Sequence, residues 1–288
     1  MLAAFLVLAG CNSDNESSSE PAPVAAPAPA SPRHSDPAAG GNLARVQAAK
    51  VLRIGVKADN PPFGFQDAEG RPQGFDVDLG FRIARVLQVQ PVFVTVTSKD
   101  RIDKLKSGEI DIIIATLTAT RSRSREIDFS IPYFQDQQGL LVAAASPIQS
   151  YRDLSGKRVA AAAGSTSIDN LKVVAPDCKS IAVKSNIEGL EKLRAGDADA
   201  ISGDGLSLQA LRVDAADPNA FRIAGEGFSV EPYAIGLPRN DSEFRVRVDE
   251  ILTELWTSGV WTRIFDKWLG PKTKYNFETH FQMPILPP

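Results

Sequence analysis

The stretch IDIIIATLTATRSRSREIDFS, residues 110–130, joins an apolar segment to a polar turn. Residues 110–116 are apolar almost throughout, which is typical of a strand covered on both faces in a parallel sheet. Such strands occur where helices pack on the two faces of the sheet. The stretch therefore predicts an α/β fold, with its polar turn following the end of a buried strand.

Three arginines alternate with serines in that turn. Thr120 followed by residues 121–126 (RSRSRE) predicts a capped helix start. At about 100° per residue, Arg121 and Arg125 then lie roughly 40° apart, whereas Arg123 points about 160° away from both. We expect Arg121 and Arg125 to be solvated and Arg123 to face a different environment.

The preceding residues repeat the alternation of strand and helix. Residues 51–56 (VLRIGV) and 91–96 (PVFVTV) predict strands, and residues 76–88 between them show helical periodicity. Asp76 suits the positive N-terminus of that helix. Together with residues 110–116, these segments predict one α/β lobe.

The same alternation begins again after residues 139–145 (GLLVAAA) and continues to about residue 221. Two extended passages, near residues 135–139 and 230–234, connect the two patterns. We therefore predict two α/β lobes joined by a two-segment hinge, which can close on a ligand. The expected boundaries are 44–136 plus 233–270 for lobe 1, 137–232 for lobe 2, and 271–288 for a tail extended on the surface.

The N-terminus has the pattern of a lipoprotein. Residues 1–10 (MLAAFLVLAG) are too few to cross a bilayer, which needs roughly twenty residues, and predict a signal peptide rather than a buried helix. Residues 8–11 (LAGC) resemble a bacterial lipobox, so Cys11 is the expected lipidation site. Residues 11–43 are rich in Pro, Ala and Ser and predict a disordered tether. We expect a protein anchored by lipid to the extracytoplasmic side of a membrane.

Several classes of chemistry are disfavoured by composition. The only histidines, His34 and His280, lie outside the predicted lobes, so nucleophilic triads and His-based zinc sites lack a residue that they need. The net charge of −3 gives no sign of nucleic-acid binding. We expect no metal and no cofactor. We also expect no internal disulfide, because acylation of Cys11 leaves Cys178 without a partner.

Six motifs follow one another along about residues 50–270. They are PPFGF (61–65), GFDVDL (74–79), RIDKLKSGEIDIIIATLTATRSRSREIDFSIPYF (101–134), LSGKRVAAAAGSTS (154–167), DADAISGD (197–204) and WTRIFDKWLG (261–270). In this order they resemble the bacterial family 3 solute-binding proteins, the receptors of polar amino acid ABC transporters. The resemblance implies the type II periplasmic binding protein fold, an ABC permease as partner, a monomer and no enzymatic activity.

The resemblance also implies a set of ligand-binding residues. Arg123 corresponds to the arginine that binds an α-carboxylate, and Asp204 to the acid that receives an α-ammonium, which together suit a zwitterion. The remaining implied contacts are Thr116, Thr118, Ser165 and Thr166. From the residues alone, the GSTS turn could instead be an ordinary helix cap, and so could Asp204.

Ligand specificity is less constrained. Lys57 and Arg101 resemble positions at which the glutamate- and aspartate-binding branch contacts a side-chain carboxylate, and their charges exceed what a zwitterion needs. Both could instead be solvated or paired within lobe 1. Asn60 stands where many members carry an aromatic residue. We expect L-glutamate or L-aspartate, with glutamine or a generalist site as the alternative.

Two other classes remain open. A few proteins with this fold are cyclohexadienyl dehydratases, which would need a general acid in the cleft beyond Asp204. A receptor sensing domain is the third possibility, although no membrane span or kinase follows residue 270.

Overall fold

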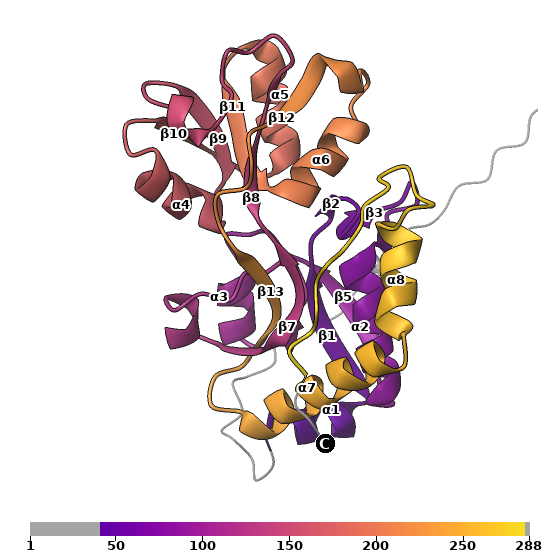
Figure 1. Ribbon diagram of the computed structural model, residues 1–288. Coiled ribbons are helices and arrows are strands. Elements are labelled where there is room, and N and C mark those ends of the chain that lie inside the picture. Colours follow the sequence, from indigo (N-terminus) through magenta and orange to yellow (C-terminus); the bar gives the residue numbers. More distant parts are fainter. Residues whose placement is uncertain (1–40, 286–288) are drawn as a thin grey trace, which may run out of the picture. The chain divides into compact units, whose positions relative to one another are not determined.

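The computed structural model describes residues 41–285. The predicted signal peptide, Cys11 and all of the predicted tether except its last three residues lie outside this range. The described chain is built on two five-stranded mixed sheets with helices packed against them (Figure 1). The predicted two-lobed α/β fold is confirmed.

The first sheet has the strand order β5-β1-β6-β13-β7. Strand β1 pairs in parallel with β5 and β6, whereas β13 runs antiparallel to β6 and β7. The predicted strand at residues 110–116 forms ladder pairs only at Ile112 and Ile113, because the chain turns away at Thr116, whose φ is +42°. The strands are β1 (Val51–Val56), β5 (Gln90–Thr95), β6 (Ile112–Ile113), β7 (Asp128–Asp136) and β13 (Glu231–Leu237).

The second sheet has the strand order β10-β9-β11-β8-β12. Strand β9 is parallel to β10 and β11, and β8 is antiparallel to β11 and β12. The alternation of strands and helices predicted from residue 139 to about residue 221 is present. The strands are β8 (Gln138–Ala143), β9 (Arg158–Ala162), β10 (Lys179–Val183), β11 (Ala200–Asp204) and β12 (Phe221–Ala224).

The chain passes between the two sheets twice. Strand β7 is followed by β8 with only Gln137 between them, and β12 returns to β13 through residues 225–230. Asp136 and Glu231 are register partners in the first sheet, so the two passages lie side by side. Acidic side chains therefore stand where both passages meet.

Helices flank both sheets, and three further short strands form a separate small sheet. Helix α1 was not predicted and begins within the last residues assigned to the tether. The helices are α1 (Asn42–Ala49), α2 (Phe75–Val86), α3 (Arg101–Lys106), α4 (Thr166–Val174), α5 (Asn186–Ala195), α6 (Gly205–Val213), α7 (Ser242–Thr257) and α8 (Val260–Trp268). The short strands are β2 (Asp59–Asn60), β3 (Gly64–Gln66) and β4 (Pro72–Gln73).

The arginine-rich turn is shorter than predicted. It forms a single 3₁₀ turn, Arg123–Arg125, rather than the start of an α-helix. Thr120 accepts a hydrogen bond from the Arg123 backbone N–H at 3.2 Å, so the expected cap contact is present. Arg121 and Arg125 are exposed and Arg123 is partly buried, as expected, although the turn is not the α-helix that the angular argument assumed.

The C-terminal tail is attached more firmly than predicted. Phe277 and Met283 are buried against the core of the first lobe, so the tail does not simply lie on the surface. At Asp214, after α6 of the second lobe, the tail makes two polar contacts. The Lys274 ammonium lies 2.5 Å from the Asp214 carboxylate, and the Tyr275 hydroxyl donates to it at 2.8 Å.

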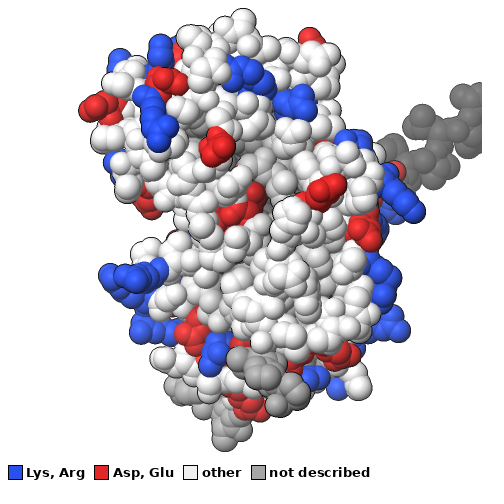
Figure 2. Space-filling view, viewed as in Figure 1, with Lys and Arg blue, Asp and Glu red and all other residues white. Residues whose placement is uncertain are grey.

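The visible surface carries interspersed charges of both signs rather than one large basic face (Figure 2). Among residues 41–285, no helix has the length and apolarity that a membrane span needs.

Candidate functional site

The predicted site residues come from both lobes and lie near the ends of strands. Lys57 follows β1, Thr116 and Thr118 follow β6, and Asp204 ends β11. Ser165 and Thr166 follow β9, while Arg101 begins α3 and Arg123 begins the 3₁₀ turn. Ligands of open α/β sheets bind outside the carboxyl ends of the strands, which is where this set lies.

Arg123 connects the two lobes directly. Its guanidinium donates to the Thr118 carbonyl at 2.7 Å and to the Gly164 carbonyl, on the opposite lobe, at 3.0 Å. Burial lowers the pKa of Arg123, and the carboxylates of Asp204 and Glu231 oppose that effect. The cation is thus held between the lobes by backbone carbonyls.

Gly164 is a point of close contact between the lobes. Its φ is +76°, and a Cβ at this position would lie 2.6 Å from the Lys99 Cα and from the Ser98 carbonyl oxygen. A side chain here would be strained and would collide with backbone of the first lobe. The observed approach of the lobes therefore requires glycine.

Arg101 and Thr116 form a buried polar group near the end of β6. Arg101 is only 2% exposed, and its Nη1 donates to the Ala115 carbonyl at 2.5 Å. Among residues 41–285, the Arg101 Nε and the Thr116 Oγ1 are buried and have no hydrogen-bond partner. Buried polar atoms are nearly always paired, so both are candidate contacts for a ligand.

Asp76 places a buried carboxyl group against Thr116. It is fully buried and accepts hydrogen bonds from the Thr116 N–H at 3.0 Å and the Tyr133 hydroxyl at 2.9 Å. Burial raises the pKa of Asp76 to about 7. Burial, with a smaller contribution from the charge of Arg101, lowers the pKa of Lys57 to about 8. The net positive charge of this part of the site is therefore smaller than a count of Lys57 and Arg101 in the sequence suggested.

Glu231 joins side chains from both lobes. It is 1% exposed, and it accepts hydrogen bonds from the hydroxyls of Thr118 at 2.7 Å, Thr166 at 2.8 Å and Ser229 at 2.6 Å, and from the Asn170 amide at 3.0 Å. Thr118 and Thr166 come from opposite lobes. Sequence analysis missed Glu231, because nothing in its local motif separates it from an ordinary strand residue.

The hydroxyl of Thr166 is fully committed to protein partners. It donates to Glu231 and accepts from the Gln138 side-chain amide at 2.8 Å. The Ser165 hydroxyl likewise donates to the Ala162 carbonyl at 2.7 Å. What the GSTS turn can offer a ligand is therefore the backbone N–H groups at the start of α4, which helices leave unpaired.

Asp204 shares one hydroxyl with a second acid. The Tyr233 hydroxyl lies 2.8 Å from Asp204 Oδ2 and 3.2 Å from Asp136 Oδ2. Burial raises the pKa of Asp204, and the charge of Glu231 adds to the effect. Burial and the charge of Asp204 raise the pKa of Asp136 to about 7. Sequence analysis did not assign Asp136 or Tyr233 to the site.

A small cavity, of about 10 Å³, lies between the lobes beside Lys57. The contact of Arg123 with Gly164 and the close approach of Gly164 to Lys99 show that the lobes are closed upon each other there. Its lining also includes Asp59, Asn60, Lys184 and Asn186.

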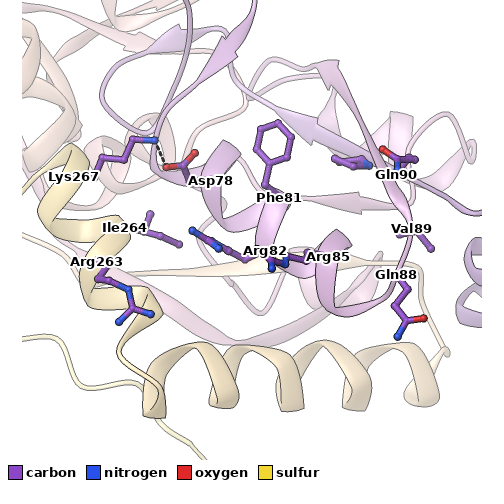
Figure 3. A pocket seen from close by; sticks show the side chains of 11 residues that line it. Asp78, Phe81, Arg82, Arg85, Gln88, Val89, Gln90, Arg263, Ile264 and Lys267 are labelled. Carbon is purple, nitrogen blue, oxygen red and sulfur yellow. Dashed lines mark hydrogen bonds and ion pairs between the residues drawn. The ribbon is translucent and has the colours of Figure 1, made fainter.

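A larger groove, of about 790 Å³, lies between α2 and α8 (Figure 3), and none of the predicted site residues lines it. Arg82, Arg85 and Arg263 line this groove, and Lys267 pairs with Asp78 at 2.6 Å. The described residues hold no cluster of side chains suited to a metal.

A fold with two lobes, closed over opposed charges, is that of a ligand-capturing receptor. Residues 52–271 match the bacterial extracellular solute-binding proteins, family 3, and the chain belongs to this family. It is therefore an extracytoplasmic solute-binding protein of the kind that serves amino-acid ABC transport. The recognition made from the motifs is confirmed.

Individual relatives cover most of the chain. An ABC transporter glutamine-binding protein of Bacillus subtilis (strain 168) is 34% identical over 79% of this chain and 84% of its own. An ancestral arginine-binding protein bound to glutamine is 36% identical, with a TM-score of 0.73 over 77% of this chain and 98% of its own. An ancestral amino acid-binding protein described as a precursor of cyclohexadienyl dehydratase is 29% identical, with a TM-score of 0.74 over 80% of this chain and 100% of its own.

Proposed function

We propose that the protein captures one polar L-amino acid between its lobes and delivers it to an ABC permease. The observation that carries this proposal is that each lobe supplies a side chain of opposite charge, Arg123 from the first lobe and Asp204 from the second. Arg123 is a partly buried guanidinium suited to a carboxylate, and Asp204 is a carboxylate suited to an ammonium. Thr116, Thr118 and the N–H groups at the start of α4 would complete the contacts to the backbone of the ligand.

L-Glutamine fits the side-chain end of the site better than L-glutamate. Lys57 and Arg101 can donate to an amide oxygen, while Asp59 and Asn60, which line the same cavity as Lys57, can accept from an amide nitrogen. Asp76 offsets part of the positive charge that a second ligand carboxylate would need. The similarity to a glutamine-binding relative supports the same choice.

L-Glutamate and L-aspartate remain the second candidates. They are favoured by the three cations Lys57, Arg101 and Arg123, which influence one another electrostatically within the closed site. A fully ionised side chain would be stabilised there if Asp76 kept a proton.

An enzymatic role is a weaker proposal. The site holds more buried acids than the sequence suggested, but their oxygens are engaged. Asp76 accepts from Thr116 and Tyr133, and Glu231 accepts four hydrogen bonds. A general acid must reach a substrate atom, and these groups instead hold the protein together. We propose that the protein binds its ligand without converting it.

Attachment to the membrane through a lipid on Cys11 is part of the same proposal. A single polypeptide, tethered outside the cytoplasm by the segment before α1, would meet its permease at the membrane surface. Mass spectrometry of the membrane-extracted protein should find the diacylated cysteine at the N-terminus, and an unmodified N-terminus would rule this out.

The test begins with a thermal-shift screen of the twenty amino acids on the purified protein, because a ligand of the native state raises the melting temperature. Calorimetry then measures the affinity of the best ligand. Arg123→Ala should weaken binding by about 3 to 5 kcal/mol, because a carboxylate is left without its partner. Arg125→Ala, at an exposed neighbour, is the matched control. Equal affinities of the two variants would refute the assignment.

A further inference from the structure

One hydroxyl contacts two carboxylates at the hinge. The Tyr233 oxygen lies within hydrogen-bond distance of Asp204 Oδ2 and Asp136 Oδ2, at 2.8 and 3.2 Å. A tyrosine hydroxyl has a single proton and can donate it to only one of these oxygens. The other contact is a hydrogen bond only if that carboxyl carries a proton of its own. The geometry thus favours one extra proton in the group of three.

The surroundings of Asp136 make it the natural holder of that proton. Asp136 is 9% exposed and Tyr233 is fully buried, so water can do little to stabilise a second negative charge. Asp136 does accept the backbone N–H of Gln137 at 2.8 Å and of Leu206 at 3.1 Å. These N–H groups are not enough to offset burial and the facing charge of Asp204, which together raise the pKa of Asp136 to about 7.

Asp204 has more reason to remain ionised. Burial and the charge of Glu231 raise the pKa of Asp204, but the Tyr233 hydroxyl, Lys57 and Arg101 all favour its charged form. The closer contact of the shared hydroxyl is also to Asp204. Asp204 ends β11 and is influenced by the charges of Lys57 and Arg101 from the first lobe, while Asp136 accepts the backbone N–H of Leu206 in α6. These contacts favour the charge on Asp204, which the cations stabilise, and the proton on Asp136.

Building on the proposed function, we propose that Asp136 is a positioning residue that holds a proton behind Asp204, and that binding of a ligand ammonium releases this proton to solvent. The balance is simple. The ligand enters with its ammonium intact and contributes one positive charge, and the group of Asp136, Tyr233 and Asp204 loses one proton. The charge at these three groups is conserved, because one positive charge arrives and one leaves, while the α-carboxylate of the ligand faces Arg123.

The coupling has a definite sign. Below the midpoint of the group, its proton competes with the ligand ammonium, so affinity rises with pH by up to about tenfold per unit. Above the midpoint no proton remains to be released, and affinity becomes level. The useful range is about pH 5.5 to 7.5, where Lys57, whose pKa is about 8, stays largely charged. A solute captured at neutral pH would be released more readily in an acidic compartment.

The test is calorimetry of L-glutamine, or of the amino acid that gives the largest thermal shift, at pH 7 in phosphate and in Tris. The dependence of the apparent enthalpy on the ionisation enthalpy of the buffer counts the protons released. We expect about half a proton for a group that titrates near pH 7. No release by the wild-type protein would overturn the proposal.

Two variants should shift the linkage in opposite directions. Asp136→Asn removes the proton-holding group, so release at pH 7 should fall close to zero while the ligand still binds. Tyr233→Phe removes the hydroxyl that stabilises the ionised acids, so the midpoint should move to higher pH and release at pH 7 should increase. Asp249→Asn is the control. Burial also raises the pKa of Asp249, but this residue lies in α7 and accepts a hydrogen bond from the Ile131 backbone N–H rather than from Tyr233. Unchanged release in Asp136→Asn would assign the proton elsewhere and overturn the proposal.

A measurement without ligand separates this inference from the proposed function. Difference titration of the unliganded wild-type and Asp136→Asn proteins should show one proton, centred near pH 7. A centre near the ordinary pKa of an aspartate, about 4, would overturn the inference even if amino acids bind. Failure of all twenty amino acids to bind would instead refute the proposed function and leave this titration as the readout.

Discussion

The Thr118 hydroxyl donates a 2.7 Å hydrogen bond to Glu231, which follows it by 113 residues. The whole second sheet, β8 to β12, and helices α4 to α6 lie between these two residues in the sequence. The same carboxylate holds Thr166 from the opposite lobe, so Glu231 is bonded to both lobes in the closed protein. Its four donors make it the most highly coordinated acid of the hinge among the described residues.

Glu231→Gln should weaken ligand binding through the closed state. A glutamine has only one acceptor oxygen, and its amide N–H₂ would face the donors that now bond to the carboxylate. Hydrogen bonds to charged groups contribute about 1.5 to 3 kcal/mol, so we expect a ten- to hundredfold loss of affinity. Calorimetry measures the affinity, and small-angle scattering measures the degree of closure. Glu226→Gln, in the exposed part of the same passage, should match the wild type.

Gly164→Ala should obstruct closure itself. The added Cβ would lie 2.6 Å from the Lys99 backbone, and only opening of the lobes relieves that contact. Gly156→Ala is an informative control, because Gly156 also has a positive φ, +71°, but no atom lies within 4 Å of a Cβ there. Both variants should lose about 1 kcal/mol of stability, whereas only Gly164→Ala should lose ligand affinity. Similar affinities would show that the lobes need not approach this closely.

Lys57→Gln should separate the two candidate ligands. A neutral side chain at this position removes the attraction for a second carboxylate but can still donate to an amide oxygen. We therefore expect a loss of about tenfold or less for L-glutamine and a clearly larger loss for L-glutamate, measured by competition calorimetry. Lys99→Gln, at an exposed lysine, is the control. An equal loss of affinity for both ligands would show that the site does not discriminate between a charged and a neutral ligand side chain.

Asp76 should make the folded protein less stable as pH rises. Its pKa is raised from 3.8 to about 7, so the folded state binds this proton more tightly than the unfolded state does. The contribution is favourable below about pH 4 and is lost as pH rises towards 7. Asp76→Asn should reduce the difference in free energy of unfolding between pH 5 and pH 8, measured with urea. A difference as large as that of the wild type would refute this.

The fold was predictable because its signals are local and repeated. Apolar runs such as residues 51–56 and helical periodicity such as residues 76–88 recur in both lobes, and the structure contains the corresponding β1 and α2. The strand at residues 110–116 was predicted too long, because apolar character persists into the loop where Thr116 adopts a left-handed backbone. Helix α1 was not predicted because it is short and adjoins a segment of low complexity.

The candidate site was only partly predictable. The predicted contacts lie in recognisable motifs, and those motifs can be read without a structure. Asp136, Glu231 and Tyr233 carry no such signal, because each lies in a strand and becomes notable only where the two passages of the hinge meet. Asp76 was predicted as a helix-start residue, and its contacts to Thr116 and Tyr133 depend on tertiary packing.

The tail beyond α8 is attached to both lobes, so its contacts depend on the hinge movement. Phe281 stacks on Phe134 of the first lobe with ring centroids 6.2 Å apart, while Lys274 and Tyr275 hold Asp214 of the second. Hinge opening has to break or stretch one of these attachments. An environment-sensitive fluorophore placed at exposed Asn276, between them, would change its emission with each capture event and turn the receptor into an optical sensor of its solute.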